Sequence, residues 1–470
     1  MLTKKQANTS AVKVAISYPP LISKKGRPFL SQNRQFQWTN TKNIIYPVIP
    51  ASAATLLKSK GYQVFWDDAI AQNISFNSWL TRLKKEKPDY IAIETKTPVV
   101  KKHWQIIKKI KKESLKIKNW KLKIILIGDH VTALPKESYK NCPVDHIING
   151  GHYDLLLLDY ISGKKNNLTL KDLPPIDRKL TQWQLYAYNN TNFKYRPGAY
   201  TMFGRDCWWG RCTFCSWTTL FPGKCYQART PKQAFLEVKK LIKLGAKEIF
   251  DDSGTFPVGD WLKEFCQYLI KYKTKIRLGC NMRFGALSEE DFSLMHQAGF
   301  RFMLFGLESA NQKTLDKINK NNKIENIIPT LKLCKKYNID AHITIMVGYP
   351  WESKKDLDNT LNLSREIFKK NLAASLQATI IIPYPGTPLF KYCQRNKLLL
   401  TENWDKYNMR QPIIKTKNPK YLKTAVQNLF KSIITPRYIF AKIINIRSIS
   451  DIKFLFFYAI KYLKKLNDFR

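Results

Sequence analysis

The sequence has no apolar stretch long enough to cross a membrane. Its longest apolar run, residues 454–460, is far shorter than the roughly 20 residues that a spanning helix needs. The lysine-bearing N-terminus also has no apolar segment of the kind found in secretory signals. These absences exclude a transmembrane protein and predict a cytoplasmic one.

Acidic residues are scarce. There are 35 Asp and Glu against 80 Lys and Arg, which gives a formal net charge of +45. Such a surplus favours nucleic acid, anionic lipid or acidic substrates as partners. Lysine is spread along the whole chain, so composition alone selects none of them. Only residues 101–123 and the tail from Lys415 onward concentrate the charge.

A disulfide framework is also not indicated. The nine cysteines are an odd number, and in a reducing compartment they are better interpreted as thiols or metal ligands. With 470 residues, 44% of them hydrophobic, the chain is too long for one compact core and too apolar for a disordered one. We therefore expect two or three globular domains.

The first part of the chain alternates strand-like and helix-like segments. The expected strands are 12–17, 62–66, 90–94 and 123–128, and the expected helices are 51–60 and 104–112. Strands separated by helices predict right-handed βαβ units and a parallel sheet covered on both faces. Residues 11–163 are therefore expected to form a doubly wound α/β domain.

A polar segment without clear periodicity, 164–197, is expected to be a linker, and a second alternation follows it. Its expected strands are 199–204, 248–252, 276–280, 302–306, 341–347 and 375–382. Six strands alternating with helices predict a partial (β/α)6 barrel of the TIM type over 198–415, with function at the C-terminal strand ends. Ser288 is expected to cap one of these helices. Residues 416–470 are expected to form a basic helical extension.

Three cysteines follow the first strand of this second half. Cys207, Cys212 and Cys215 lie in a glycine-containing loop, which can turn their thiols toward one metal centre. A structural zinc site normally closes with four ligands, whereas an iron–sulfur cluster held by three cysteines leaves one iron open to an outside molecule. The alternative is a zinc site completed by Cys225 or a histidine.

On this loop the chain resembles the radical S-adenosylmethionine (SAM) enzymes, in particular the class with an N-terminal cobalamin-binding-type domain. The family spacing is C-x3-C-x2-C with an aromatic residue before the third cysteine, here Phe214. This chain has C-x4-C-x2-C, and the extra residue falls in the Trp208-Trp209-Gly210 stretch. The resemblance implies that the three cysteines hold a 4Fe–4S cluster, that SAM binds its open iron, and that a donor such as flavodoxin or ferredoxin supplies electrons.

Two further segments resemble the family's SAM-binding motifs. The resemblance implies that Asp251, Asp252 and Ser253, after the second barrel strand, contact the methionyl ammonium group, for which carboxylates are suited. It also implies that Glu308, in the segment 305–309, contacts the ribose.

The later strands carry weaker similarities. Residues 346–352, which include Gly348, resemble the family's G-x-P-G-E segment, with Trp351 in place of a glycine, and 383–388 resemble its PGTP turn. Arg283, just after the third strand, would hold the methionyl carboxylate if it points into the barrel. A surface salt bridge is the alternative for this residue.

The N-terminal half resembles the family's cobalamin domain in residues 46–64, 125–135 and 150–151. The D-x-H-x-x-G motif that supplies a cobalt-ligating histidine in other cobalamin proteins is absent. His130, His146 and His152 lie near expected strand ends. The resemblance therefore implies cobalamin held in the crevice outside the strand C-termini, without a histidine ligand.

These observations lead to three functional hypotheses. The first is a radical SAM enzyme that abstracts hydrogen from an unactivated carbon of a small-molecule or lipid substrate and methylates it through methylcobalamin. The second keeps the radical step but ends in cyclisation, rearrangement or oxidation. The third, less favoured, is a basic nucleic-acid-binding protein with a structural zinc. The aromatic and basic tail, 421–470, is expected either to contact an anionic membrane surface or to cap the barrel.

Overall fold

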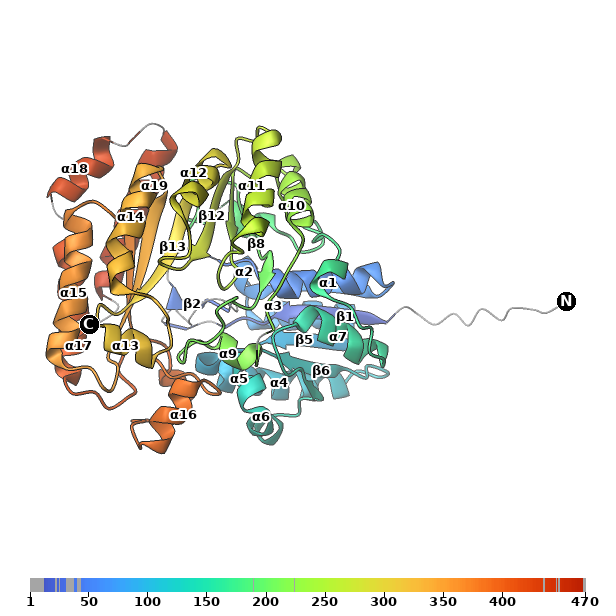
Figure 1. Cartoon of the computed structure of the whole chain (residues 1–470). Helices are drawn as coiled ribbons and strands as arrows, with labels where there is room; N and C mark the ends of the chain where they lie inside the picture. The colour runs from blue at the N-terminus through green and yellow to red at the C-terminus, as the bar shows by residue number, and fades with distance from the viewer. Residues whose placement is uncertain are drawn as a thin grey trace.

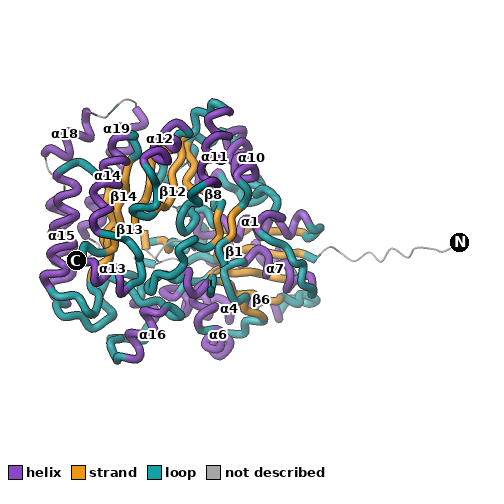
Figure 2. Tube along the Cα trace, in the orientation of Figure 1, coloured by secondary structure: helices purple, strands orange, loops and turns teal. Residues whose placement is uncertain are grey.

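Two parallel sheets, one from each half of the chain, lie side by side (Figure 1). The computed structural model describes residues 12–467 except 22, 25, 31–37, 40–43, 189, 224, 434–435, 445 and 447–448. Helices flank the strands of both sheets, as Figure 2 shows by colour. Among the described helices, none combines the length and the apolar character that crossing a bilayer requires.

The described residues of the first half form a sheet with the strand order β4-β1-β5-β6-β7. Its strands are β1 (Lys13–Tyr18), β4 (Gln63–Asp68), β5 (Tyr90–Glu94), β6 (Lys123–Ile127) and β7 (His146–Ile147). All pairs are parallel. Strands such as β6 are rich in isoleucine and buried on both faces, because helices cover a parallel sheet on both sides.

The connections run outward from β1 in both directions. The gap between β1 and β5 is therefore the switch point at which doubly wound sheets bind ligands. The helices of this half are α1 (Val48–Ser59), α2 (Ala69–Gln72), α3 (Phe76–Glu86), α4 (Val100–Leu115), α5 (Asp129–Ala133), α6 (Pro135–Asn141) and α7 (Tyr153–Ser162). The predicted doubly wound fold is confirmed.

The second sheet follows chain order, β8-β11-β12-β13-β14-β15, with every pair parallel. The strands are β8 (Gly198–Thr201), β11 (Glu248–Asp251), β12 (Arg277–Met282), β13 (Phe300–Glu308), β14 (Asp340–Val347) and β15 (Ser375–Ile380). The helices between them are α10 (Pro231–Lys243), α11 (Asp260–Lys271), α12 (Glu289–Gln297), α13 (Gln312–Lys317), α14 (Ile327–Lys336) and α15 (Lys354–Lys369). Each βα unit thus adds its strand to the same edge, which confirms the partial (β/α)6 barrel.

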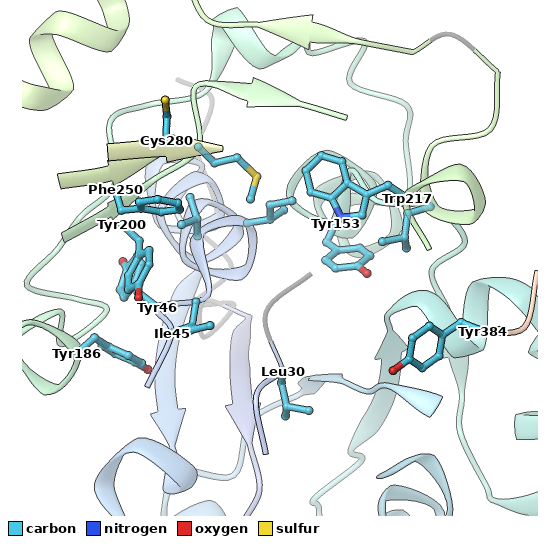
Figure 3. Packing of buried hydrophobic residues seen from close by; sticks show 14 of the residues in the cluster. Leu30, Ile45, Tyr46, Tyr153, Tyr186, Tyr200, Trp217, Phe250, Cys280 and Tyr384 are labelled. Carbon is cyan, nitrogen blue, oxygen red and sulfur yellow. The ribbon is translucent and has the colours of Figure 1, made fainter. Parts of the chain in front are cut away.

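The segment predicted to be a linker, 164–197, is packed between the two halves and contains η2 (Leu170–Asp172) and α8 (Gln184–Ala187). Its buried Arg178 donates hydrogen bonds to the carbonyl of Tyr200 at 2.9 Å and to Glu237 at 2.9 Å. The guanidinium also lies 4.6 Å from the ring centroid of Tyr46. Figure 3 shows Tyr46 and Tyr200 from the two halves close together. The predicted domain limits themselves stay predictions.

The C-terminal part is helical, as expected. It contains α16 (Pro388–Arg395), η4 (Trp404–Lys406), α17 (Pro419–Ile433), α18 (Pro436–Ile444) and α19 (Ile449–Asn467). Helix α17 packs against α15 and β15 on the side of the barrel away from the N-terminal sheet (Figure 1).

Candidate functional site

The three predicted cluster ligands share one loop between β9 (Gly204–Arg205) and α9 (Trp217–Leu220), just beyond the end of β8. Cys212 is buried, and Cys207 and Cys215 are half-buried. Burial, together with the neighbouring thiol of Cys212, raises the pKa of Cys215 to about 12. The loop therefore brings the three sulfurs within electrostatic reach of one another.

In the described part of the chain, no three His, Cys, Asp or Glu side chains are close enough to hold a single metal ion. A cluster places its cysteines on separate irons, so it does not need them as close as a zinc ion does. Cys225, the alternative fourth zinc ligand, is exposed, and its thiol donates to the carbonyl of Pro222. The donor set thus fits a three-cysteine cluster.

The second half of the loop is fixed by backbone hydrogen bonds from distant elements. The amide of Thr213 donates to the carbonyl of Ile318 at 2.9 Å, and its carbonyl accepts from the amide of Leu389 at 2.8 Å. In the first half, the sulfur of Cys207 lies 3.0 Å from the hydroxyl of Thr255, just beyond β11. The cysteine loop is therefore held by α13, α16 and the turn after β11.

The longer first gap is accommodated by two tryptophans. The indole of Trp208 donates to the carbonyl of Phe256 at 3.1 Å, and that of Trp209 donates to the carbonyl of Asn319 at 2.7 Å. Gly210 then turns the chain with a φ of +59°, a value that favours glycine. The extra residue thus forms a turn anchored to neighbouring loops.

Two cations lie beside the buried thiols. Arg283 is buried, donates to the carbonyl of Lys320 and lies with its guanidinium 4.8 Å from the ring centroid of Trp209. Burial raises the pKa of Cys212, while Lys320 and Arg283 act in the opposite direction. Since iron binds thiolates, both cations favour the form that a cluster requires.

Glu308 ends β13 and folds back toward the cysteine loop. Its carboxylate lies 2.9 Å from the ammonium of Lys320, which in turn lies 5.8 Å from the ring centroid of Phe214. A Cβ on Gly306 would come within 2.2 Å of this carboxylate, so only glycine leaves it room. The residue predicted to contact the ribose is thus held beside the cysteine loop by Lys320.

The acidic turn after β11 holds strand ends together. Asp251 accepts hydrogen bonds from the amide of Phe203 at 2.8 Å and from the hydroxyl of Thr201 at 3.1 Å. Burial raises the pKa of Asp251 to about 6. Ser253 accepts from the amide of Gly204 at 2.8 Å, and Asp252 is buried beside them.

At Gly254, the next residue of this turn, the backbone lies close to the cysteine loop. A Cβ on Gly254 would come within 2.9 Å of the Cβ of Cys207 and within 2.7 Å of the ring of Trp217. The cysteine loop therefore packs on backbone at this point.

Gly348, after β14, has a φ of +93°, and a Cβ there would come within 3.1 Å of Leu422 on α17. The next residue, Tyr349, is fully buried, and its hydroxyl has no hydrogen-bond partner among the described residues. Burial and the charges of Glu308 and Glu352 raise the pKa of Tyr349 well above its ordinary value. Tyr349 adds a polar group to the site that motif similarity did not single out.

The N-terminal crevice contains a second group of buried polar side chains, at the switch point between β1 and β5. Tyr18 donates a hydrogen bond of 2.5 Å to one oxygen of Glu94, whose other oxygen is buried without a partner in the described chain. Lys96 and Asp129, both buried, form an ion pair at 3.2 Å. An unpartnered acceptor in this crevice fits a ligand rich in amide donors, such as cobalamin.

The three histidines near strand ends of this half contact other side chains. The two ring nitrogens of His130 lie 3.2 Å from the hydroxyl of Thr97 and 3.2 Å from the carboxylate of Glu137. His146 stacks on a tyrosine ring, and His152 lies edge-on to a phenylalanine. Both nitrogens of His130 are thus engaged, whereas the buried Nδ1 of His152 has no hydrogen-bond partner among the described residues. The absence of a histidine ligand stays a prediction.

The N-terminal half contacts the chain on both sides of the cysteine loop. Before the loop, Arg205 forms a buried ion pair of 2.6 Å with Asp154 of α7. After it, the carbonyl of Leu220 accepts a hydrogen bond of 2.8 Å from the amide of Gly151. The cysteine loop is therefore bounded at both ends by contacts with the doubly wound domain.

Comparisons with known proteins identify the class. Residues 201–364 match the model of the Radical SAM superfamily. The chain is 26% identical over 376 residues to an uncharacterized methyltransferase of Pyrococcus horikoshii, covering 75% of this chain and 79% of that protein. It is 25% identical over 404 residues to the anaerobic magnesium-protoporphyrin IX monomethyl ester cyclase of Rubrivivax gelatinosus, covering 78% of this chain and 70% of that one.

Solved structures extend the similarity of fold to both halves. The cobalamin-dependent SAM radical enzyme OxsB, solved with aqua-cobalamin and SAM, has a TM-score of 0.69 at 15% identity, covering 94% of this chain and 72% of OxsB. The radical SAM methyltransferase TsrM of Kitasatospora setae, solved with cobalamin and a 4Fe–4S cluster, has a TM-score of 0.65 at 13% identity, covering 91% of this chain and 90% of TsrM.

Residues 201–364 therefore form a radical SAM domain, and the chain has the two-domain fold of the solved cobalamin-dependent enzymes OxsB and TsrM. A radical SAM domain implies a 4Fe–4S cluster and SAM as cofactors. The match favours the cluster over the structural-zinc hypothesis and its nucleic-acid partner.

Proposed function

We propose that this radical SAM enzyme is a cobalamin-dependent methyltransferase acting on an unactivated carbon of a small-molecule or lipid substrate. The observation that carries the proposal is the cysteine loop bounded on both sides by the doubly wound domain, through Asp154 and Gly151. The similarity to a methyltransferase over most of both chains supports it. A bound cluster would supply the electron that splits SAM, and bound methylcobalamin would supply the methyl group.

The protein's own residues would bind and orient these groups. Cys207, Cys212 and Cys215 would hold the cluster, with Arg283 and Lys320 favouring the thiolate forms. Phe214, Asp251, Asp252, Ser253, Glu308 and Gly348 surround the loop or follow the neighbouring strands and would line the SAM site. Electrons would come from an outside reductant such as flavodoxin or ferredoxin, as is usual for this superfamily.

In the N-terminal crevice, the free oxygen of Glu94 would accept a hydrogen bond from cobalamin. Tyr18 would hold that carboxylate in place. The buried Lys96–Asp129 pair would close the same end of the sheet to water.

The test begins with the cluster. Protein purified and reconstituted without oxygen should hold about four irons per chain, as a 4Fe–4S cluster requires. Cys212→Ala should lose the iron and the brown colour, because one of three ligands is missing. Cys225→Ala is the matched control, since this thiol is exposed outside the loop, and it should keep both. One zinc and no iron in the wild type would contradict the proposal.

A second candidate is a radical reaction that ends in cyclisation, rearrangement or oxidation. It is favoured by the similarity to the Rubrivivax cyclase. Methyl transfer should release both 5′-deoxyadenosine and S-adenosylhomocysteine, whereas the second candidate should release 5′-deoxyadenosine alone. Product analysis by mass spectrometry after cobalamin titration distinguishes the two.

A further inference from the structure

The last two helices expose a large apolar surface. Large hydrophobic side chains with at least a third of their surface exposed gather on α18 and α19: Ile439, Phe440, Ile443, Ile444, Ile449, Ile452, Phe456 and Phe457. Ile449 is 72% exposed, Phe440 63% and Phe456 62%. Single exposed apolar residues are ordinary, but eight of them on two consecutive helices point to an interaction surface.

Polar groups take part in attaching both helices to the rest of the chain. On α18, the buried Tyr438 donates a hydrogen bond of 2.7 Å to the carbonyl of Ala374. On α19, the buried Asp451 forms an ion pair of 2.6 Å with Lys194. A surface helix normally buries its apolar face and exposes its polar one. On α18 this orientation is reversed. Helix α19 half-buries Phe454 and Leu455, yet Ile449, Ile452 and Phe456 stay exposed, so apolar side chains of both helices are left for a partner outside the barrel.

The spacing places the exposed apolar residues on one side of each helix. Ile439, Phe440, Ile443 and Ile444 recur at three- and four-residue intervals, as do Ile449, Ile452 and Phe456. Such spacing places side chains on one side of a helix. The exposed Lys453 lies among the residues of α19 on the same side.

The positive charge of the chain favours an anionic bilayer over a second copy of the chain as the partner of these helices. The chain carries a formal +45, and Asp451, the one acidic residue of segment 436–467, is already paired inside. A second copy of this chain would bring an equally positive surface and be repelled. An anionic bilayer supplies both an apolar interior and negative head groups. Neither helix is a membrane-spanning segment in the described chain.

We propose that α18 and α19 lie in the interface of an anionic lipid bilayer and anchor the enzyme to it. Phe440, Ile449 and Phe456 enter the acyl region, and Lys453 stays at the head groups. The binding places the barrel beside the membrane without crossing it. This anchoring does not depend on the methyl-transfer proposal, since it concerns a different part of the chain.

The test is flotation of the full-length protein with vesicles of phosphatidylcholine alone and of an equimolar mixture with phosphatidylglycerol. The wild type should float with the mixed vesicles only. The double variant Phe440→Ser/Phe456→Ser should bind about a hundredfold more weakly, because burying each phenylalanine contributes about a factor of ten. Leu115→Ser, which removes an exposed apolar residue of α4, is the control and should bind like the wild type.

A second part of the test changes the charge of the protein and the ionic strength. Lys453→Glu should weaken binding to mixed vesicles about fivefold or more, and added salt should weaken wild-type binding. No flotation with mixed vesicles, or equal flotation of the phenylalanine double variant, would overturn the proposal. So would light scattering that shows a dimer of the wild type and a monomer of the double variant, because the face would then join two copies.

Discussion

Glu94 and Asp154 are both buried carboxylates, yet their pKa values are shifted in opposite directions. Burial raises the pKa of Glu94 to about 7, with Lys96 only partly opposing it. Burial also acts on Asp154, but Arg205 outweighs it and lowers the pKa of this group. A direct guanidinium partner therefore decides whether a buried carboxyl stays charged. Asp154 serves as a structural ion, and Glu94 can exchange a proton near neutral pH.

This shift predicts a pH-dependent effect of Glu94→Gln. The pKa of Glu94 rises from 4.5 in the unfolded chain to about 7 in the folded one. The folded state therefore holds the proton more tightly, and the contribution of Glu94 to stability is lost as the pH rises through that window. Glutamine keeps the acceptor for Tyr18 without the charge, so the variant should be more stable than the wild type by about 3 kcal/mol at about pH 8.

Thermal unfolding of the apoprotein at about pH 5 and about pH 8 provides the measurement. The advantage of the variant should shrink at the lower pH, where the wild-type carboxyl is protonated as well. An equal difference at both pH values would show that burial of the charge is not its cause.

The three proposed cluster ligands can be predicted from the sequence, because their spacing lies within one short loop and does not depend on how the rest of the chain folds. Lys320 is not. It is one of 80 Lys and Arg, and nothing in its neighbourhood marks it as buried. Its contact with Glu308 arises because the chain returns to the end of β13 after α13. The unpartnered hydroxyl of Tyr349 likewise follows from burial by elements distant in sequence.

At the scale of elements, capping residues in the sequence predicted where a helix begins. Ser288 forms the capping box expected for the start of α12, since its hydroxyl accepts from the amide of Asp291 at 3.2 Å and its own amide donates to that carboxylate at 3.0 Å. Strand limits were less accurate. β13 runs over Phe300–Glu308 instead of 302–306, because pairing with β12 and β14 extends it.

Loss of this cap gives a prediction for α12. Ser288→Ala should reduce the free energy of unfolding by about 1 kcal/mol, because the amide of Asp291 loses its acceptor at the helix start. Ser293→Ala, inside the same helix, is the matched control and should leave stability unchanged or slightly improved. Urea unfolding followed by circular dichroism compares them. Equal losses in both variants would show that the cap is not the cause.

At the scale of the whole molecule, the N-terminal domain stabilises the cysteine loop from both ends. The Arg205–Asp154 pair is almost fully buried, and removing one partner of such a pair leaves an uncompensated charge. Because Cys207 lies two residues after Arg205, a disturbance at the domain interface should reach the cluster. The two domains are therefore expected to depend on each other for cluster retention.

Asp154→Ala tests this dependence. It should lower the free energy of unfolding by about 3–5 kcal/mol and reduce the iron kept after reconstitution and desalting. Adding Arg205→Met should recover part of both losses, because the unpaired charge is gone. Glu289→Ala, which breaks the exposed pair with Lys336, is the control and should change neither. Wild-type iron content in Asp154→Ala would contradict the coupling.

The sequence by itself determined the two α/β halves, the three cysteines and the basic, aromatic tail, because periodicity, spacing and composition are local properties of the chain. Only the tertiary structure decided that segment 164–197 is packed between the halves and that Lys320 and Arg283 face the thiols. It alone also showed that α18 and α19 expose large apolar side chains. These features depend on which distant segments meet, and that is set by the packing of the whole chain.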